Sequence, residues 1–149
     1  MKNCIALLAA TLIAIISGAQ ISVTGTSSSV QVGNNAPAVV IDASLSVSTA
    51  HAIGSFTVSI SNFSAGDVLA YTGSLPSGVT ANYASGSGIL TFSGNASASN
   101  YQALLRTVTF STTSSSTTSR IITFTAGDGA STYYSTNGHY YAFVSGSFN

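Results

Sequence analysis

The chain has 149 residues, of which 45% are hydrophobic and only 4% are charged, and its formal net charge is zero. Soluble globular domains usually carry about 25% charged residues, so neutral polar groups must solvate this protein, and the sequence supplies 28 serines and 18 threonines. The only cations, Lys2, Arg106 and Arg120, form no basic stripe for nucleic acid. The single cysteine, Cys4, excludes a disulfide framework and a zinc–cysteine site. The length is that of one domain.

Residues 1–19 have the pattern of a secretory signal peptide. Lys2 precedes an apolar run over residues 5–16, and small residues at 17–19 stand before the expected cleavage site. The run is too short for a membrane span, which needs about 20 apolar residues. We therefore expect a secreted protein, extracellular or at the cell surface, with no membrane segment after cleavage. The alternative is a retained hydrophobic helix that packs in an assembly, as in pilin-like subunits.

Residues 20–37 are rich in Ser, Thr, Gly and Asn and offer little to bury. We expect a linker here, with one strand around residues 30–32. Pro37 favours an extended entry into the next segment, so the domain is expected to span residues 38–149.

Apolar residues alternate with Ser and Thr along most of this domain, most clearly at Phe56, Val58 and Ile60. A period of two buries one face of a strand and exposes the other. The same period recurs at Val39 and Ile41, Leu45 and Val47, Val79 to Tyr83, Ile89 to Phe92, Val108 and Phe110, and Ile122 and Phe124. Short strands of this composition at regular spacing indicate an all-β fold, an antiparallel β-sandwich.

One segment departs from this rhythm. Ser99 followed by Gln102 fits a capping box, and good helix formers come next. We expect a single short helix near residues 98–104. Tyr101, Leu104 and Leu105 share one face of that helix, so they are predicted to close the core.

Asn137-Gly138 lies between two aromatic runs and predicts a β-hairpin, because both turn residues need positive φ. In that register Tyr134 lies opposite Tyr141. Cross-strand aromatic pairs stabilise such a hairpin. Strand alternation turns about half of the hairpin tyrosines outward as a candidate contact surface, made of Tyr133, Tyr134, Tyr140 and Tyr141.

Five segments, in the right order, together resemble a cadherin-like repeat of secreted bacterial adhesin and surface proteins. They are Asn34–Pro37, Phe63–Leu69 with its Gly-Asp-Val-Leu end, Gly88–Gly94, Tyr101–Phe110, and Arg120–Thr125 followed by Asp-Gly. The resemblance implies an immunoglobulin-like sandwich that serves in adhesion or as a spacer. Such repeats occur in tandem, whereas this chain carries a single copy.

Related repeats also cluster acidic residues to bind calcium, but here Asp42, Asp67 and Asp128 are widely separated. Calcium prefers six to eight oxygen ligands, so the sequence predicts no metal and no other cofactor, with calcium as the one candidate to test. His51 and His139 are expected at the surface, because no base-orienting partner is evident. Nucleophile, phosphate-binding and zinc-helix motifs do not occur in the sequence. We expect no catalytic residue and no enzymatic activity.

Arg106 and Arg120 each have two interpretations. Either could pair with an Asp and fasten the fold, or bind a ligand carboxylate. Asn62 and Asn95 begin N-glycosylation sequons, which matter if the protein is eukaryotic.

The scarcity of charge bears on function. Exposed strand edges are usually guarded by Lys, Pro or bulges, and charge repulsion keeps proteins dispersed. We therefore expect a non-enzymatic structural or adhesive module in an extracellular fibre, surface layer or matrix. Its partners would be copies of itself or other surface proteins, joined through uncharged β edges. The alternative is a secreted carbohydrate-binding module that stacks glycans on outward tyrosines.

Overall fold

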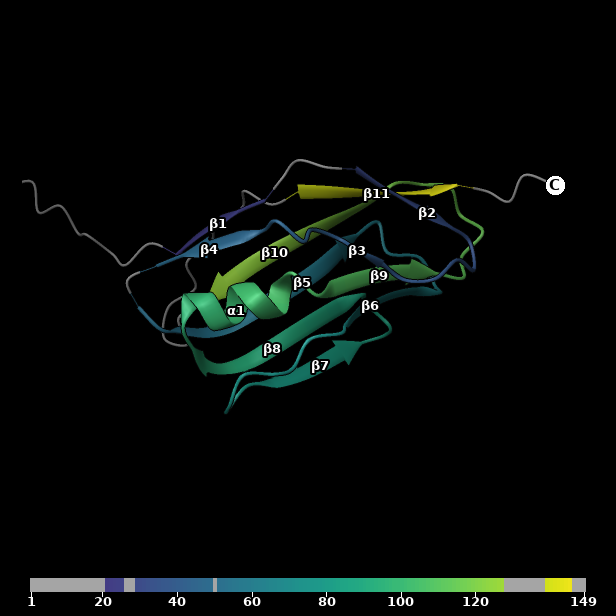
Figure 1. The fold of residues 1–149 in the computed structure, drawn as a ribbon. Helices are drawn as coiled ribbons and strands as arrows, with labels where there is room; N and C mark the ends of the chain where they lie inside the picture. Colours follow the sequence, from purple (N-terminus) through teal and green to yellow (C-terminus); the bar gives the residue numbers. More distant parts are fainter. Residues whose placement is uncertain (1–20, 26–28, 50, 128–138, 146–149) are drawn as a thin grey trace, which may run out of the picture.

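The structure is a computed structural model that describes residues 21–25, 29–49, 51–127 and 139–145, with the backbone alone described for 29–31 and 139–145. These residues form an all-β fold with one short helix, α1 (Ala98–Leu105) (Figure 1). Within these ranges, no helix has both the length and the apolar character that a membrane crossing requires. The predicted signal peptide, residues 1–19, lies outside the described residues.

The strands form one large sheet, one small sheet and a two-stranded ribbon. The large sheet has the spatial order β2 (Ser29–Gly33), β11 (His139–Ser145), β10 (Arg120–Gly127), β5 (Ile53–Ser61), β8 (Ile89–Ala96) and β7 (Thr80–Ala84). The small sheet has the order β3 (Val39–Val40), β9 (Val108–Thr112) and β6 (Asp67–Tyr71), and the ribbon pairs β1 (Ser22–Thr24) with β4 (Ser46–Ser48). All of these pairs are antiparallel except β2 with β11, which run parallel.

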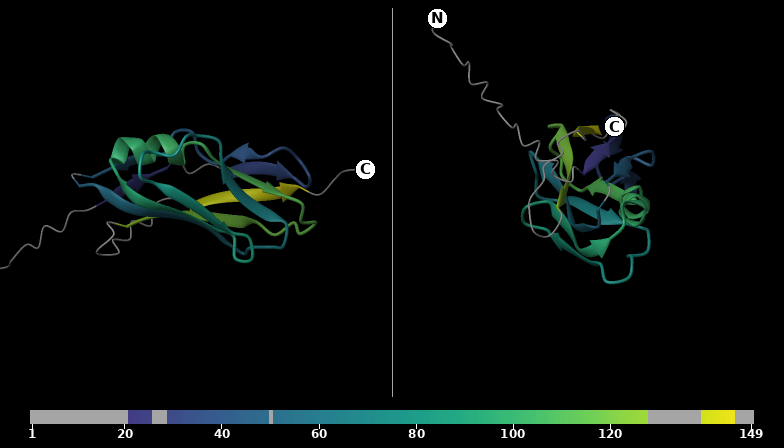
Figure 2. Two further views of the ribbon diagram at one scale, coloured as in Figure 1. Left: turned by 90° about the horizontal axis from the view of Figure 1, so that it is seen from below. Right: turned by 90° about the vertical axis from the view of Figure 1, so that its left-hand side faces the viewer.

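The core lies between the two sheets, as the alternation of apolar residues predicts. On β5, Phe56, Val58 and Ile60 are buried, and on β9 Val108 and Phe110 face them from the small sheet. Seen end-on, the strands enclose this core and α1 lies at one side of it (Figure 2). The predicted two-layer, all-β arrangement is therefore confirmed, with one parallel pair that the sequence did not indicate.

Helix α1 forms where it is predicted, but its N-cap differs. The Ser97 side chain accepts the N–H of Asn100, so the helix starts two residues earlier than a cap at Ser99 would give. Gln102 does not reach back to the cap, because its side-chain oxygen accepts the N–H of Val47 on β4. The face of Tyr101, Leu104 and Leu105 is buried, as expected.

The N-terminal segment is part of the fold, so the expected linker over residues 20–37 is wrong. Ile21 and Val23 are buried in the core, and β1 pairs with β4 of the same chain. The strand expected around residues 30–32 is confirmed as β2, where Val32 is buried. Strand β1 thus comes from a segment whose composition hides it, whereas β2 was predicted.

The predicted hairpin register at the C-terminus is also wrong. On β11, Tyr141 pairs with Ile121 of β10 on one side and with Ser29 of β2 on the other. Both positions beside Tyr141 in the sheet are therefore filled by β10 and β2, and Tyr134 lies outside the described residues. The Asn137-Gly138 turn itself also lies outside the described residues.

Candidate interaction surface

A buried ion pair joins the two sheets. Arg120 on β10 of the large sheet donates from Nε to Asp67 Oδ2 on β6 of the small sheet at 2.6 Å, and from Nη2 to Oδ1 at 3.3 Å. Both side chains are 0% exposed. This two-pronged geometry is the strong form of an arginine–carboxylate contact, and it confirms the interpretation of Arg120 as a structural residue.

Further donors satisfy the two charges. Asp67 also accepts the Thr112 hydroxyl at 2.7 Å and the N–H of Ser64 at 2.8 Å, while Arg120 Nη1 donates to the carbonyl of Thr118. A buried pair is tolerated only when its remaining hydrogen-bonding groups find partners. These contacts meet that condition, so the pair fixes the position of β6 against the large sheet.

The contact described for the Arg106 side chain is with a backbone carbonyl. Its Nε donates to the carbonyl of Leu45 at 2.7 Å, just beyond the end of α1, and the side chain is half-buried. It therefore fastens the helix end to the segment before β4, and the structure gives no support to a role in binding a carboxylate ligand.

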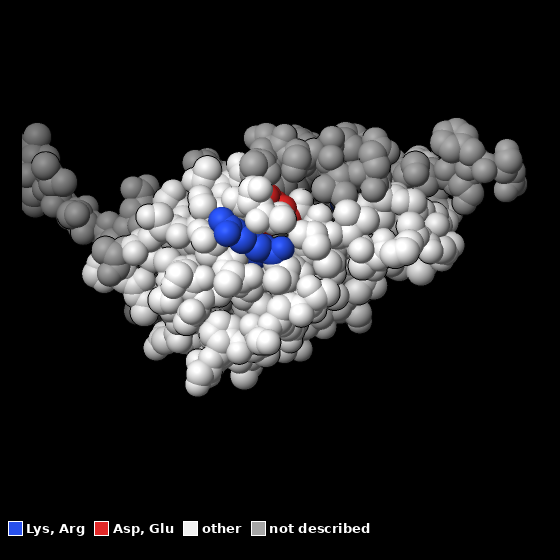
Figure 3. Space-filling model, in the orientation of Figure 1, with Lys and Arg blue, Asp and Glu red and all other residues white. Residues whose placement is uncertain are grey.

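The described surface is almost free of charge. Of the four charged residues in the described ranges, Asp42, Asp67 and Arg120 are buried and Arg106 is half-buried. Among the described residues, the face in Figure 3 shows one blue patch, a trace of red and otherwise white, uncharged residues. No group of three or more His, Cys, Asp or Glu residues that could hold a metal is found in the described ranges.

The other predicted site residues are scattered. Tyr133 and Tyr134 lie outside the described residues, as does Asp128, and Tyr140, Tyr141 and His139 belong to β11, whose side chains are not described. His51 is exposed, as expected. The two sequon asparagines, Asn62 and Asn95, are both exposed, 33 positions apart in sequence.

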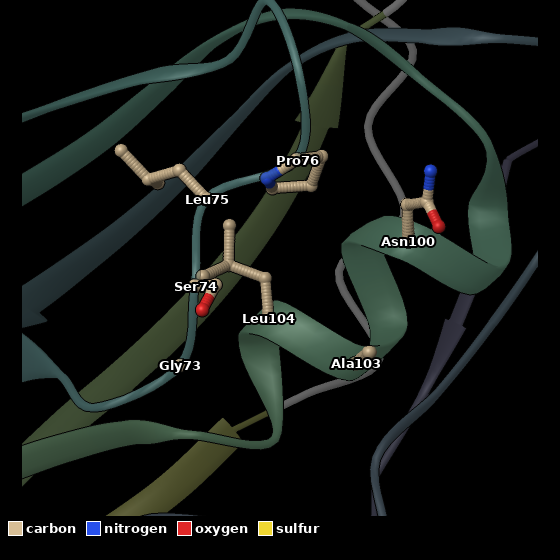
Figure 4. Close-up of a pocket in the computed structure, with 7 residues that line it drawn as sticks. All are labelled: Gly73, Ser74, Leu75, Pro76, Asn100, Ala103 and Leu104. Carbon is tan, nitrogen blue, oxygen red and sulfur yellow. The ribbon is translucent and has the colours of Figure 1, made fainter.

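Two shallow hollows flank α1. One lies between the helix and the loop before β7, where Leu104 points toward Leu75 and Pro76 (Figure 4). The other lies at the start of the helix and is lined by His51, Asn95 and Ser97 among others. Neither is lined by Asp, Glu, Lys or Arg. In the second hollow the hydroxyls of Ser97 and Ser99 hydrogen-bond to each other at 2.9 Å, and Ser97 caps the helix.

The edge of the small sheet, β6, is guarded by a tyrosine. The N–H and C=O groups of the even-numbered residues of β6 form the hydrogen bonds to β9. Those of the odd-numbered residues therefore point away from β9. The Tyr83 hydroxyl, from β7, donates to the carbonyl of Asp67 at 2.8 Å and is hydrogen-bonded by the backbone of Leu69. The Tyr83 hydroxyl thus occupies backbone groups of β6 that a neighbouring strand would otherwise bind. Amino-acid composition alone does not indicate this protection.

The edge of the large sheet, β7, has no such guard among the described residues. The N–H of Ile60 donates to the carbonyl of Gly88, which shows that the even-numbered residues of β8 form the hydrogen bonds to β5. The odd-numbered residues of β8 therefore form the hydrogen bonds to β7 on its other side. In the β7–β8 register, even-numbered residues of β7 meet odd-numbered residues of β8. The N–H and C=O groups of Ala81 and Tyr83 therefore point outward.

An open groove separates these two edges. It has a volume of 370 Å³ and lies between Leu69, Ala70 and Tyr71 of β6 and Ala81, Asn82 and Tyr83 of β7. We call it the β6–β7 groove. The ring of Tyr71 packs edge-on against the buried ring of Phe92 at 5.3 Å, so the groove has an apolar wall.

Comparisons with protein families, with curated proteins and with solved structures found no match to this chain.

Loss of Arg120 tests the ion pair. In Arg120→Met the Asp67 carboxylate stays buried without its partner, so we expect the free energy of unfolding to fall by about 3–5 kcal/mol. Urea denaturation followed by circular dichroism measures this loss. The double variant Asp67→Asn/Arg120→Met should be more stable than Arg120→Met alone; equal stability of the single variant and the wild type would contradict the role of the pair.

Alkaline pH tests the Tyr83 guard. Burial, with the nearby Asp67 charge, raises the pKa of Tyr83 above its ordinary value of 10.0, and burial likewise raises the pKa of Tyr101. Above pH 10 an unfolded tyrosine ionises while the folded one stays neutral, so stability is lost as pH rises. Tyr83→Phe should show a shallower alkaline loss of stability than the wild type; an unchanged slope would refute the assignment.

Proposed function

We propose that this protein is a secreted, non-enzymatic structural or adhesive module that associates with copies of itself through uncharged β edges. The observation that carries the proposal is the nearly neutral surface: of the four charged residues in the described ranges, three are buried and only Arg106 is partly exposed. Copies of such a surface do not repel one another, and water-exposed strand edges then pair readily.

The ends of the large sheet support this proposal. Its end strands are β2, with the sequence SVQVG, and β7, with the sequence TANYA. Neither sequence contains a charge or a proline, which are the usual means of preventing edge-to-edge pairing. Of these two strands, β7 has outward N–H and C=O groups, at Ala81 and Tyr83, that it can offer to another chain.

The finer assignment to an immunoglobulin-like, cadherin-like sandwich belongs to the same proposal. It rests on the resemblance of the sequence motifs, two of which contribute the partners of the buried ion pair. Asp67 comes from the Gly-Asp-Val-Leu motif and Arg120 from the closing strand. A physical link between two motifs that are 53 positions apart gives both a structural reason to occur together.

The carbohydrate-binding alternative has no comparable support. It requires outward tyrosines as stacking platforms, but the tyrosines with described side chains, Tyr71, Tyr83 and Tyr101, are half-buried or buried. The four tyrosines first considered for this role have no described side chains.

Sedimentation velocity of the secreted protein over a hundredfold concentration range tests the proposal. We expect species larger than the monomer, whose share grows with concentration. A single monomeric species throughout would contradict self-association and leave adhesion to a different partner as the surviving part of the proposal.

A further inference from the structure

The large sheet extends one strand beyond the small sheet. Strand β6, the edge of the small sheet, contacts β8 across the layers, while β7 lies one strand further out. As a result, Ala81 and Tyr83, which face inward from β7, remain half-exposed. The sandwich is thus open along the β6–β7 groove. The outer edge of β7 and part of its inner face are both uncovered.

From this arrangement we infer that β7 binds β7 of a second copy of this chain in antiparallel fashion, joining two large sheets into one. This inference rests on the proposed self-association and identifies the edge through which it occurs. Bare N–H and C=O groups at a sheet edge are the usual basis of strand addition. Because the same strand serves both copies, the contact is two-fold symmetric.

The positions of the free backbone groups select the register. They belong to Ala81 and Tyr83, so four hydrogen bonds form when Ala81 of each copy pairs with Tyr83 of the other. Asn82 then lies opposite Asn82 of the second copy, on the two-fold axis. In this register Thr80 lies opposite Ala84.

The side chains fit this pairing. Thr80, Asn82 and Ala84 are exposed on the outer face, and none is charged. A second β7 would also cover the half-exposed Ala81 and the outer side of the β6–β7 groove. A charged partner strand would find no opposite charge on β7 to pair with. A neutral copy of the same strand has no charge to remove from water when the contact forms.

An equivalent pairing of β6 with β6 is excluded by the same geometry. On the outer side of β6, across the groove, lies β7 of the other sheet. Two copies joined through β6 would place their large sheets in the same space. In addition, the Tyr83 hydroxyl already engages the outward groups of Asp67 and Leu69.

Disulfide trapping tests both the edge and the register in the full secreted chain. Residues directly opposite in a non-hydrogen-bonded antiparallel pair have Cα atoms about 4.5 Å apart, which lies within disulfide reach. Asn82→Cys should therefore form a covalent dimer on mild oxidation. Thr80→Cys and Ala84→Cys alone should not, but a mixture of these two variants should cross-link.

Charge provides the second test. Asn82→Lys places two like charges opposite each other and should abolish dimer formation. Ser46→Lys adds the same charge at an exposed position of β4 and should leave it intact. If the wild type associates, yet Asn82→Cys cross-links no better than Thr80→Cys or Asn82→Lys associates normally, the β7 contact is wrong and self-association stands. A monomeric wild type would instead overturn both.

Discussion

The structure depends on one buried ion pair. Arg120 and Asp67 come from different sheets, and their contact at 2.6 Å is completed by the hydroxyl of Thr112 and the backbone around it. Removing both charges from water is costly, so such a pair is retained only with good geometry. The pair sets β6 in position, and β6 in turn decides where the small sheet ends and β7 is left uncovered.

The same pair removes charge from the surface. Two of the four charged residues in the described ranges are used inside the fold, and the other two are buried or half-buried. Solubility then depends on hydroxyl and amide groups, which do not keep neighbouring copies apart. The protein protects one edge with the Tyr83 hydroxyl and leaves the β7 edge bare. Of these two neighbouring edges, only β7 therefore has free backbone groups for the proposed contact.

Much of the fold could be predicted because its strands have a strong period of two. Phe56, Val58 and Ile60 are buried as the alternation indicates, and Tyr101, Leu104 and Leu105 form the buried helix face. Strand β1 escaped prediction because two apolar residues, Ile21 and Val23, are too few to show a period. The register of β11 escaped prediction because its pairing partners, β10 and β2, lie far from it in sequence. The guard role of Tyr83 depends on which strands end each sheet, which no local pattern encodes.

Ionic strength gives the most direct test of the central claim, that neutral β edges hold copies of this protein together. Salt at 1 M shortens the screening length to about 3 Å and weakens contacts between exposed charges. Sedimentation of the secreted protein at low salt and in 1 M sodium chloride should give the same associated species in the same proportions. Dissociation to monomers at high salt would show that charged groups form the contact and would contradict the account.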